Sequence, residues 1–230
     1  MSSNFDIIPT SGDIGGKTYD RFINDYWNFL MKPASILDSH VHENTIFTRG
    51  CYDYRDVHSL LDIQRRSFCG DTEESPSIIH AVGTRSSPFN PGVNYPVFVT
   101  VLDTIALYSY IDENGNSLSL SQVLDEENNA VTPRDVQLTI SQVSGGGAPT
   151  SVPVFTHHRF SASVNLEVPS DSVLADRMER PIRPGSYPNA KAEGFYVLIK
   201  FNIAGAYRIR SCGFGVRKFK YLADYYIQIP

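Results

Sequence analysis

Two histidines one residue apart, His40 and His42, have the types and spacing in this chain that could most readily do chemistry. In an extended segment, residues two apart point to the same side, so both imidazoles could bind one metal ion. The flanking residues are Asp, Ser, Glu and Asn, and a Lys-Pro pair precedes them. Because such surroundings are typical of an exposed loop, the segment supports two hypotheses, a solvated loop and a metal site.

A metal-dependent enzyme would need a third ligand close to these two histidines. In an enzyme of the double-stranded β-helix type, a distant histidine of the same barrel completes the site. His157 or His80 could supply it, if all of them line one pocket. A barrel of alternating strands and helices is excluded, because the chain lacks that alternation.

Other catalytic signatures are missing from the sequence. There is no Gly-x-Ser-x-Gly segment, and the glycines at 145–147 lack the Gly-Lys-Ser/Thr ending of a phosphate loop. The cysteines, Cys51, Cys69 and Cys212, are odd in number and match no zinc or redox spacing. Cys51 and Cys69 could pair if the chain were exported. We therefore expect a protein without catalytic residues and without a cofactor.

Tyrosine is abundant, with 13 residues in a chain of 230. Exposed aromatic rings offer an apolar face together with a polar edge, which suits stacking on sugars. If the chain binds carbohydrate, the candidate stacking residues are Tyr52, Tyr54, Tyr108, Tyr110 and Tyr187. A protein partner, through self-association or assembly, is the other partner class that the composition allows.

Charge and hydropathy exclude several partners. The net charge is −5 and the pI is near 5.6, so the chain has no positive field to attract nucleic acid or anionic lipid. No apolar run approaches the roughly 20 residues of a membrane helix. The N-terminal residues lack the basic and apolar regions of a signal peptide. We expect no nucleic-acid binding and no membrane insertion, and the sequence leaves the compartment open.

The strongest pattern is a series of strands at the end of the chain, over 194–201, 205–210 and 221–229. These strands are rich in aromatic and β-branched residues and are punctuated by glycine, and apolar residues alternate with polar ones over 136–143 and 160–168. Further apolar strands are predicted at 45–49, 77–82 and 95–102. Helical periodicity predicts helices over 18–31, 55–66 and 120–128, the last one opened by a Ser119/Gln122 capping box.

These elements predict a mainly β chain. We expect an antiparallel β-sandwich, Ig-like or jelly-roll-like, with two or three short helices, in a single domain over 1–230. Residues 1–17 are predicted to form an irregular arm, and the amphipathic 18–31 helix to pack on the sandwich. Long loops over 83–93 and 169–193 would supply a contact surface.

The order of short motifs resembles a loosely defined family of uncharacterised, mostly bacterial β-rich proteins. The family has an aromatic helix, a Phe-Leu-x-Gly strand, a Pro-containing apolar strand and two glycine-led strands near its end. The matching segments are Trp27-Asn28-Phe29-Leu30, Ile46-Phe47-Thr48-Arg49-Gly50, Tyr95-Pro96-Val97, Gly194-Phe195-Tyr196-Val197-Leu198 and Gly205-Ala206-Tyr207-Arg208-Ile209. Tyr207 stands where the family usually has histidine. The resemblance implies an architecture and transfers no catalytic residue.

Taken together, the sequence favours a non-catalytic binding or structural β-sandwich module, as part of an envelope, virion or extracellular assembly. The alternatives are a metal-dependent enzyme using His40 and His42, and a carbohydrate-binding module.

Overall fold

A computed structural model describes residues 4–32, 41–42, 45–48, 79–83, 96–111, 114–128, 131–133, 135–143, 148–172, 175, 182–214 and 220–229. Most of these residues lie in strands, and the described helices are short: α1 (Tyr19–Leu30), α4 (Leu120–Asn128) and α5 (Val154–His157). The expectation of a mainly β chain with few short helices is confirmed for this part of the chain. None of its helices has the length and apolar character needed to cross a membrane.

The first of two large sheets is built around the long strand β13. Its order is β1-β13-β7-β5-β4. β1 pairs with residues 198–201 of β13, and β12 pairs with residues 185–195 of the same strand. The pairs are antiparallel apart from β5 with β7. The strands are β1 (Phe5–Ile8), β4 (Val41–His42), β5 (Thr45–Thr48), β7 (Val97–Ala106), β12 (Arg159–Val168) and β13 (Gly185–Phe201).

The second sheet has the order β11-β10-β14-β15-β6, and only its β6–β15 pair is parallel. Its strands are β6 (Ile79–Gly83), β10 (Val136–Gln142), β11 (Thr150–Val152), β14 (Gly205–Phe214) and β15 (Lys220–Ile229). Two small hairpins complete the described strands: β2 (Asp13–Ile14) with β3 (Lys17–Thr18), and β8 (Tyr110–Ile111) with β9 (Ser117–Leu118).

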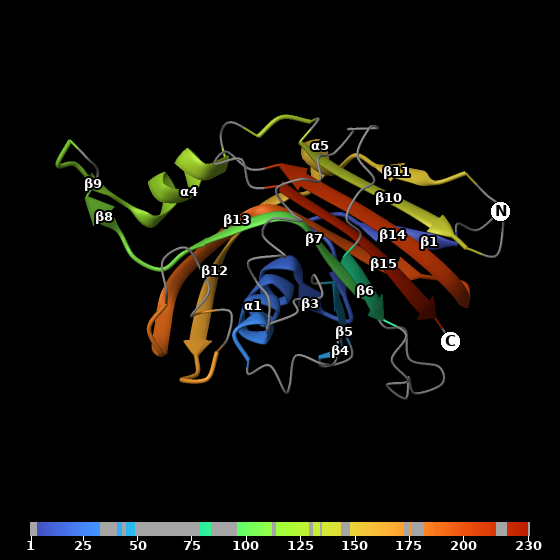
Figure 1. The fold of residues 1–230 in the computed structure, drawn as a ribbon, viewed down its shortest axis with the longest axis horizontal. Helices are drawn as coiled ribbons and strands as arrows, with labels where there is room; N and C mark the ends of the chain where they lie inside the picture. Colours follow the sequence, from blue (N-terminus) through green and yellow to red (C-terminus); the bar gives the residue numbers. More distant parts are fainter. Residues whose placement is uncertain are drawn as a thin grey trace.

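The middle of the first sheet, residues 97–102 of β7 and 194–199 of β13, is buried on both faces, because it lies between the second sheet and α1 (Figure 1). Val97, Val99 and Val197 face the second sheet and belong to the core between the two sheets. Phe98 and Leu198, which alternate with them, belong to the core under α1, called here the helix core. Burial on both faces explains why residues 194–201 read as one apolar run rather than an alternating strand.

Helix α1 forms where the aromatic periodicity predicts it. Tyr19, Phe22, Ile23, Tyr26, Phe29 and Leu30 are all buried, and Trp27 beside them is buried as well. Phe22 stacks on Phe98 with ring centroids 5.9 Å apart. The helix therefore contributes most of the large aromatic side chains of the helix core, and a polar substitution on this stripe would remove several aromatic contacts at once.

The expectation of an irregular arm over residues 1–17 is wrong. Residues 5–8 form β1, which pairs antiparallel with the end of β13. Phe5 and Ile7 pack against the core between the sheets. A tight turn at Gly15 and Gly16, with φ values of +62° and +79°, then joins β2 to β3. Because this strand has only four residues and Pro9 follows it, its period is too short to stand out in the sequence.

The expectation of a long loop over 169–193 is wrong for its last part. β13 begins at Gly185, and residues 185–193 pair with β12. The pairing compensates for the low apolar content of this segment, because the backbone gains a ladder with β12 that is interrupted only at residues 188 and 189. The predicted 55–66 helix, residues 84–93 of the predicted contact loop, and Cys51 and Cys69 lie outside the described residues.

Glycine is required where β13 crosses a bulge in β7. The register of the two strands shifts between Phe195 and Tyr196, which leaves Val101 of β7 unpaired. A Cβ at Gly194 would lie 2.4 Å from the main-chain oxygen of Leu102. The bulge therefore needs a residue without a side chain at this position.

Candidate functional site

The histidines predicted as metal ligands are not brought into one described site. His40 lies outside the described residues, and of His42 the structure describes only the backbone, in β4. His157 is the last residue of α5 and is exposed. In the part of the chain that is described, no group of three His, Cys, Asp or Glu side chains is placed to hold a metal ion. The hypothesis of a metal site at His40 and His42 therefore stays a prediction.

Two of the predicted stacking tyrosines do lie together. Tyr108 and Tyr187 have ring centroids 6.2 Å apart and ring planes inclined by 50°. Tyr108 is 56% exposed, and Tyr187 is half-buried. We call these two side chains the tyrosine pair. Tyr110 lies in β8, where only the backbone is described, and Tyr52 and Tyr54 lie outside the described residues.

The pair is built by two neighbouring antiparallel strands. Tyr108 follows the end of β7, and Tyr187 lies near the start of β13. Lys191 of β13 pairs with Ala106, so the end of one strand lies beside the beginning of the other. The Tyr187 hydroxyl donates a hydrogen bond of 2.7 Å to the main-chain oxygen of Arg183, and its ring rests on the helix core. One ring is thus fixed and the other is presented to solvent.

The surroundings of the pair are partly polar. The main-chain oxygen of Arg183, whose side chain is exposed, accepts the hydrogen bond of the Tyr187 hydroxyl. Ser186 and Glu167, which share a hydrogen bond of 2.6 Å, point to the opposite face of the sheet from Tyr187, because successive residues of a strand alternate. Ile111, three residues after Tyr108, is 70% exposed. An apolar platform with a tyrosine hydroxyl and main-chain groups at its rim is suited to binding an amphipathic ligand.

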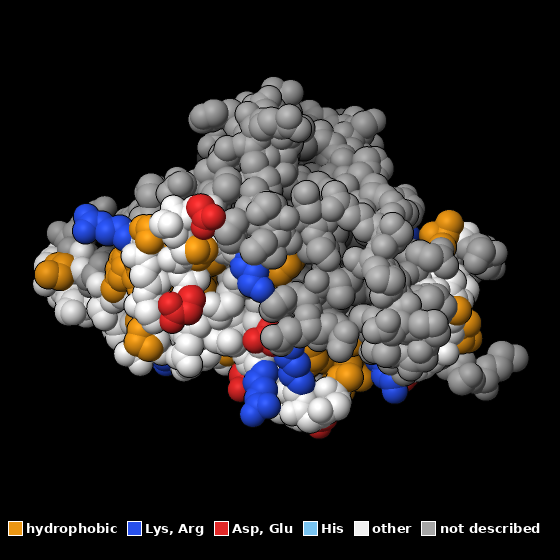
Figure 2. Space-filling model, turned by 90° about the horizontal axis from the view of Figure 1, so that it is seen from below, with side chains coloured by type: hydrophobic (Ala, Val, Ile, Leu, Met, Phe, Trp, Pro, Cys, Tyr) orange, Lys and Arg blue, Asp and Glu red, His pale blue; other side chains and the backbone are white. Residues whose placement is uncertain are grey.

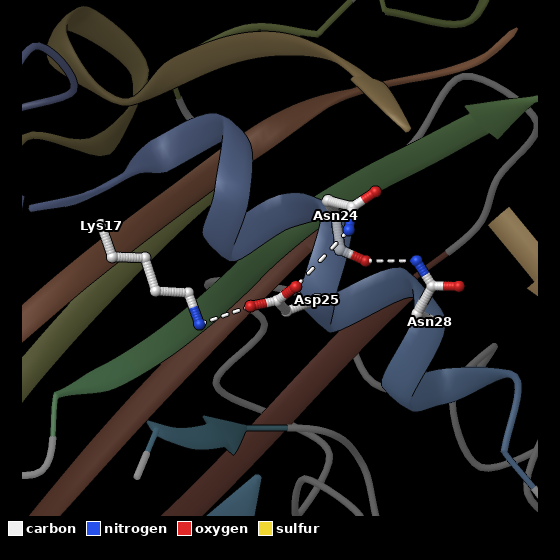
Figure 3. Close-up of polar contacts among 4 residues, drawn as sticks. All are labelled: Lys17, Asn24, Asp25 and Asn28. Atoms are coloured by element: carbon white, nitrogen blue, oxygen red, sulfur yellow. Dashed lines mark hydrogen bonds and ion pairs between the residues drawn. The ribbon is translucent and has the colours of Figure 1, made fainter. Parts of the chain in front are cut away.

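A polar pocket of about 420 Å³ lies between the β2–β3 turn, the first half of α1 and β12. Its charged groups are of both signs, and two of them are paired with each other. Lys17 forms an ion pair with Asp25 (Figure 3), and Asp20 accepts a hydrogen bond from the Thr18 hydroxyl. On the described part of the face in Figure 2, basic and acidic side chains likewise lie beside one another. The pocket therefore offers little net attraction for a charged ligand.

Three polar atoms are buried without a hydrogen-bond partner between α1 and the first sheet: Trp27 Nε1, Asp103 Oδ2 and the Tyr196 hydroxyl. Burial raises the pKa of Asp103 to about 7. Burial, together with the nearby Asp103 and Glu193 carboxylates, raises the pKa of Tyr196 well above its ordinary value. The Trp27 indole opposes this increase, although the two groups do not complete a hydrogen bond of normal geometry.

Sequence reasoning missed Asp103, although a signal was present. It is the one acidic residue of β7, a strand that is otherwise built from apolar residues and threonine. A carboxyl group in such a strand must be paired, neutral or functional, because burying an unpaired charge is costly. Its neighbours on α1 and β13 could not be read from the sequence.

Comparison of the chain with protein-family models, with curated proteins and with solved structures gave no match. The family resemblance drawn from the short motifs therefore stays a prediction.

Proposed function

We propose that this chain is a non-catalytic binding module, built as a β-sandwich, that holds a carbohydrate against the tyrosine pair. The observation that carries the proposal is the meeting of Tyr108 and Tyr187 from two strands, with one ring anchored and the other 56% exposed. The sandwich is supported by one apolar core to which both large sheets contribute. An Ig-like or jelly-roll-like connection, and a place in an envelope, virion or extracellular assembly, belong to the same proposal.

The geometry of the pair supports a sugar ring as the ligand. A pyranose has an apolar face of C–H groups that can lie on one tyrosine ring, and the second ring, inclined by 50°, can close over its edge. The hydroxyl groups at the rim of the sugar would then meet the Tyr187 hydroxyl and the main chain at Arg183. Because the platform itself is uncharged, a neutral sugar fits it better than an anionic one.

The proposal predicts which substitutions abolish binding. Tyr108→Ala should weaken the affinity for the best ligand of a glycan panel by about fivefold, because a stacked ring contributes about 1 kcal/mol. Tyr187→Phe keeps the ring and loses only the hydrogen bond to Arg183, so it should bind nearly as the unchanged chain does. Calorimetric or NMR titration measures both.

A control substitution on the surface separates the loss of ring stacking from the loss of any exposed apolar side chain. Ile203, at the turn between β13 and β14, is also exposed, and Ile203→Ala should leave the affinity unchanged. Absence of binding across neutral hexose, hexosamine and xylose polymers would overturn the carbohydrate proposal. Binding that survives Tyr108→Ala would place the site elsewhere.

A further inference from the structure

The outer edge of β12 is covered by side chains, not by another strand, in the part of the chain that the structure describes. β12 pairs with β13 alone. The backbone groups of alternate residues on such a strand point away from the sheet. Those of Asn165 and Glu167 do so, since they bond to α1. An unpaired edge of ten residues is a template for a strand from another molecule.

Two asparagines of α1 take the place of the missing strand, and we call them the asparagine clamp. The Asn165 N–H donates to Asn24 Oδ1 at 3.0 Å, and the Asn165 carbonyl accepts from Asn28 Nδ2 at 2.9 Å. The Glu167 N–H donates to Asn28 Oδ1 at 2.9 Å. Three successive edge groups of β12 are thereby satisfied by two side chains.

The distance between Asn24 and Asn28 along α1 matches the distance between successive outward-pointing residues of β12. Four residues of a helix rise about 6 Å, and two residues of a strand advance about 6.6 Å. Asn24 and Asn28 therefore reach successive outward-pointing residues of β12. Asn28 is also oriented by a second bond from Nδ2 to the main-chain oxygen of Asn24, at 2.9 Å (Figure 3).

We propose that the asparagine clamp protects this edge and that, when its hydrogen bonds to β12 open, β12 pairs with the β12 of a second copy of the chain. The proposal is independent of the carbohydrate site, because the clamp lies on α1 and the tyrosine pair does not. It gives the clamp a defined role, which is to keep the chain from joining other copies through its longest described outer strand.

The sequence of β12 favours its own copy as the partner. Two antiparallel copies that meet at Ser163 place residue 159 opposite 167, and residue 161 opposite 165. Arg159 of each copy then lies opposite Glu167 of the other, so the ends carry opposite charges. Both are exposed in the folded chain, where Arg159 is bonded to Glu193. Ser161 and Ser163 at the centre are small and uncharged.

A cysteine trap at the centre of this register tests the proposal. In the proposed pair the two copies of residue 163 are directly opposite, with Cα atoms about 5.5 Å apart, a separation that a disulfide spans. Ser163→Cys is incubated under air in mild urea, alone and combined with Asn24→Ala and Asn28→Ala. We expect the covalent dimer to form several-fold faster without the clamp, and peptide mapping to show a bond between the two copies of residue 163.

Two observations separate loss of the clamp from general destabilisation. Ser119→Ala removes a capping hydrogen bond of α4 and costs about 1 kcal/mol without touching β12. Combined with Ser163→Cys, it should cross-link as slowly as the trap alone. Equal rates in the clamp variant and in this control would overturn the proposal, as would a disulfide that maps to Cys51, Cys69 or Cys212.

A second pair of variants applies if the double alanine variant does not fold. Asn24→Asp keeps the acceptor for the Asn165 N–H, whereas Asn28→Asp loses both hydrogen bonds that its Nδ2 donates. Each adds one negative charge. We expect fast cross-linking for Asn28→Asp and slow cross-linking for Asn24→Asp, and equal rates would contradict the proposal.

Discussion

Replacing Gly194 by alanine is expected to lower the free energy of unfolding by about 3 kcal/mol or more. The added Cβ would lie 2.4 Å from the oxygen of Leu102 and 2.7 Å from Asp103 Cα. Both are backbone atoms of a strand in the middle of the first sheet, so neither can rotate away. Relief would require β7 and β13 to separate at the bulge, where both cores meet. Urea unfolding followed by the emission of Trp27 measures the change.

Gly15 provides the comparison, because its backbone conformation restricts substitution there, whereas nearby atoms restrict it at Gly194. Gly15 has open space around its Cβ position, but its φ is +62°. Gly15→Ala should therefore cost only the strain of that backbone conformation, about 1 kcal/mol. Gly213, whose Cβ would lie 2.4 Å from the oxygen of Val101, should behave like Gly194. If Gly194→Ala were as stable as the unchanged chain, the close approach of the two strands at the bulge would be wrong.

Asp103→Asn is expected to stabilise the protein at pH 8, by on the order of 2 kcal/mol, and to have little effect near pH 4. Burial raises the pKa of Asp103 from its ordinary 3.8 to about 7. Between these values the folded chain holds a proton that the unfolded chain releases. The contribution of Asp103 to stability therefore falls as pH rises through this window and is constant above it. The asparagine amide cannot ionise, so Asp103→Asn does not lose this contribution to stability as the pH rises.

Comparison of the variant with the unchanged chain isolates Asp103 from other titrating groups. Burial lowers the pKa of His158, and this group has the opposite sign, since its contribution rises with pH up to about 6.5. It is present in both proteins and cancels in the difference. Asp103→Glu keeps an ionisable carboxyl and should retain the pH dependence. A stability difference for Asp103→Asn that does not change between pH 4 and pH 8 would show that the buried carboxyl does not titrate in this window.

The elements that sequence reasoning predicted well are those whose signal is local. The 18–31 helix, the capping box at Ser119 and the alternation over 160–168 depend on residues a few positions apart. Each of these patterns forms the same local element in any fold in which its apolar side chains can be buried. The strand at residues 5–8 and the start of β13 at Gly185 were missed, because their stability comes from partners far away in the sequence.

The candidate site was predictable in its residue types and not in its arrangement. Abundant tyrosine indicated ring stacking, and five positions fitted equally well. Only the pairing of Ala106 with Lys191 decides that Tyr108 and Tyr187 meet. Asp103 stood out as a carboxyl in an apolar strand, but its neighbours Trp27 and Tyr196 come from other elements.

The sequence by itself determined the mainly β character of this protein, the amphipathic helix and the net charge of −5. These follow from composition and short-range periodicity, which the chain carries wherever it folds. Tertiary structure alone decided that β7 and β13 are buried on both faces, that α1 caps the edge of β12 and that two tyrosines share a surface. The physical reason is that burial, edge pairing and ring contacts depend on residues more than 70 positions apart in the chain, and no local pattern specifies which of them meet.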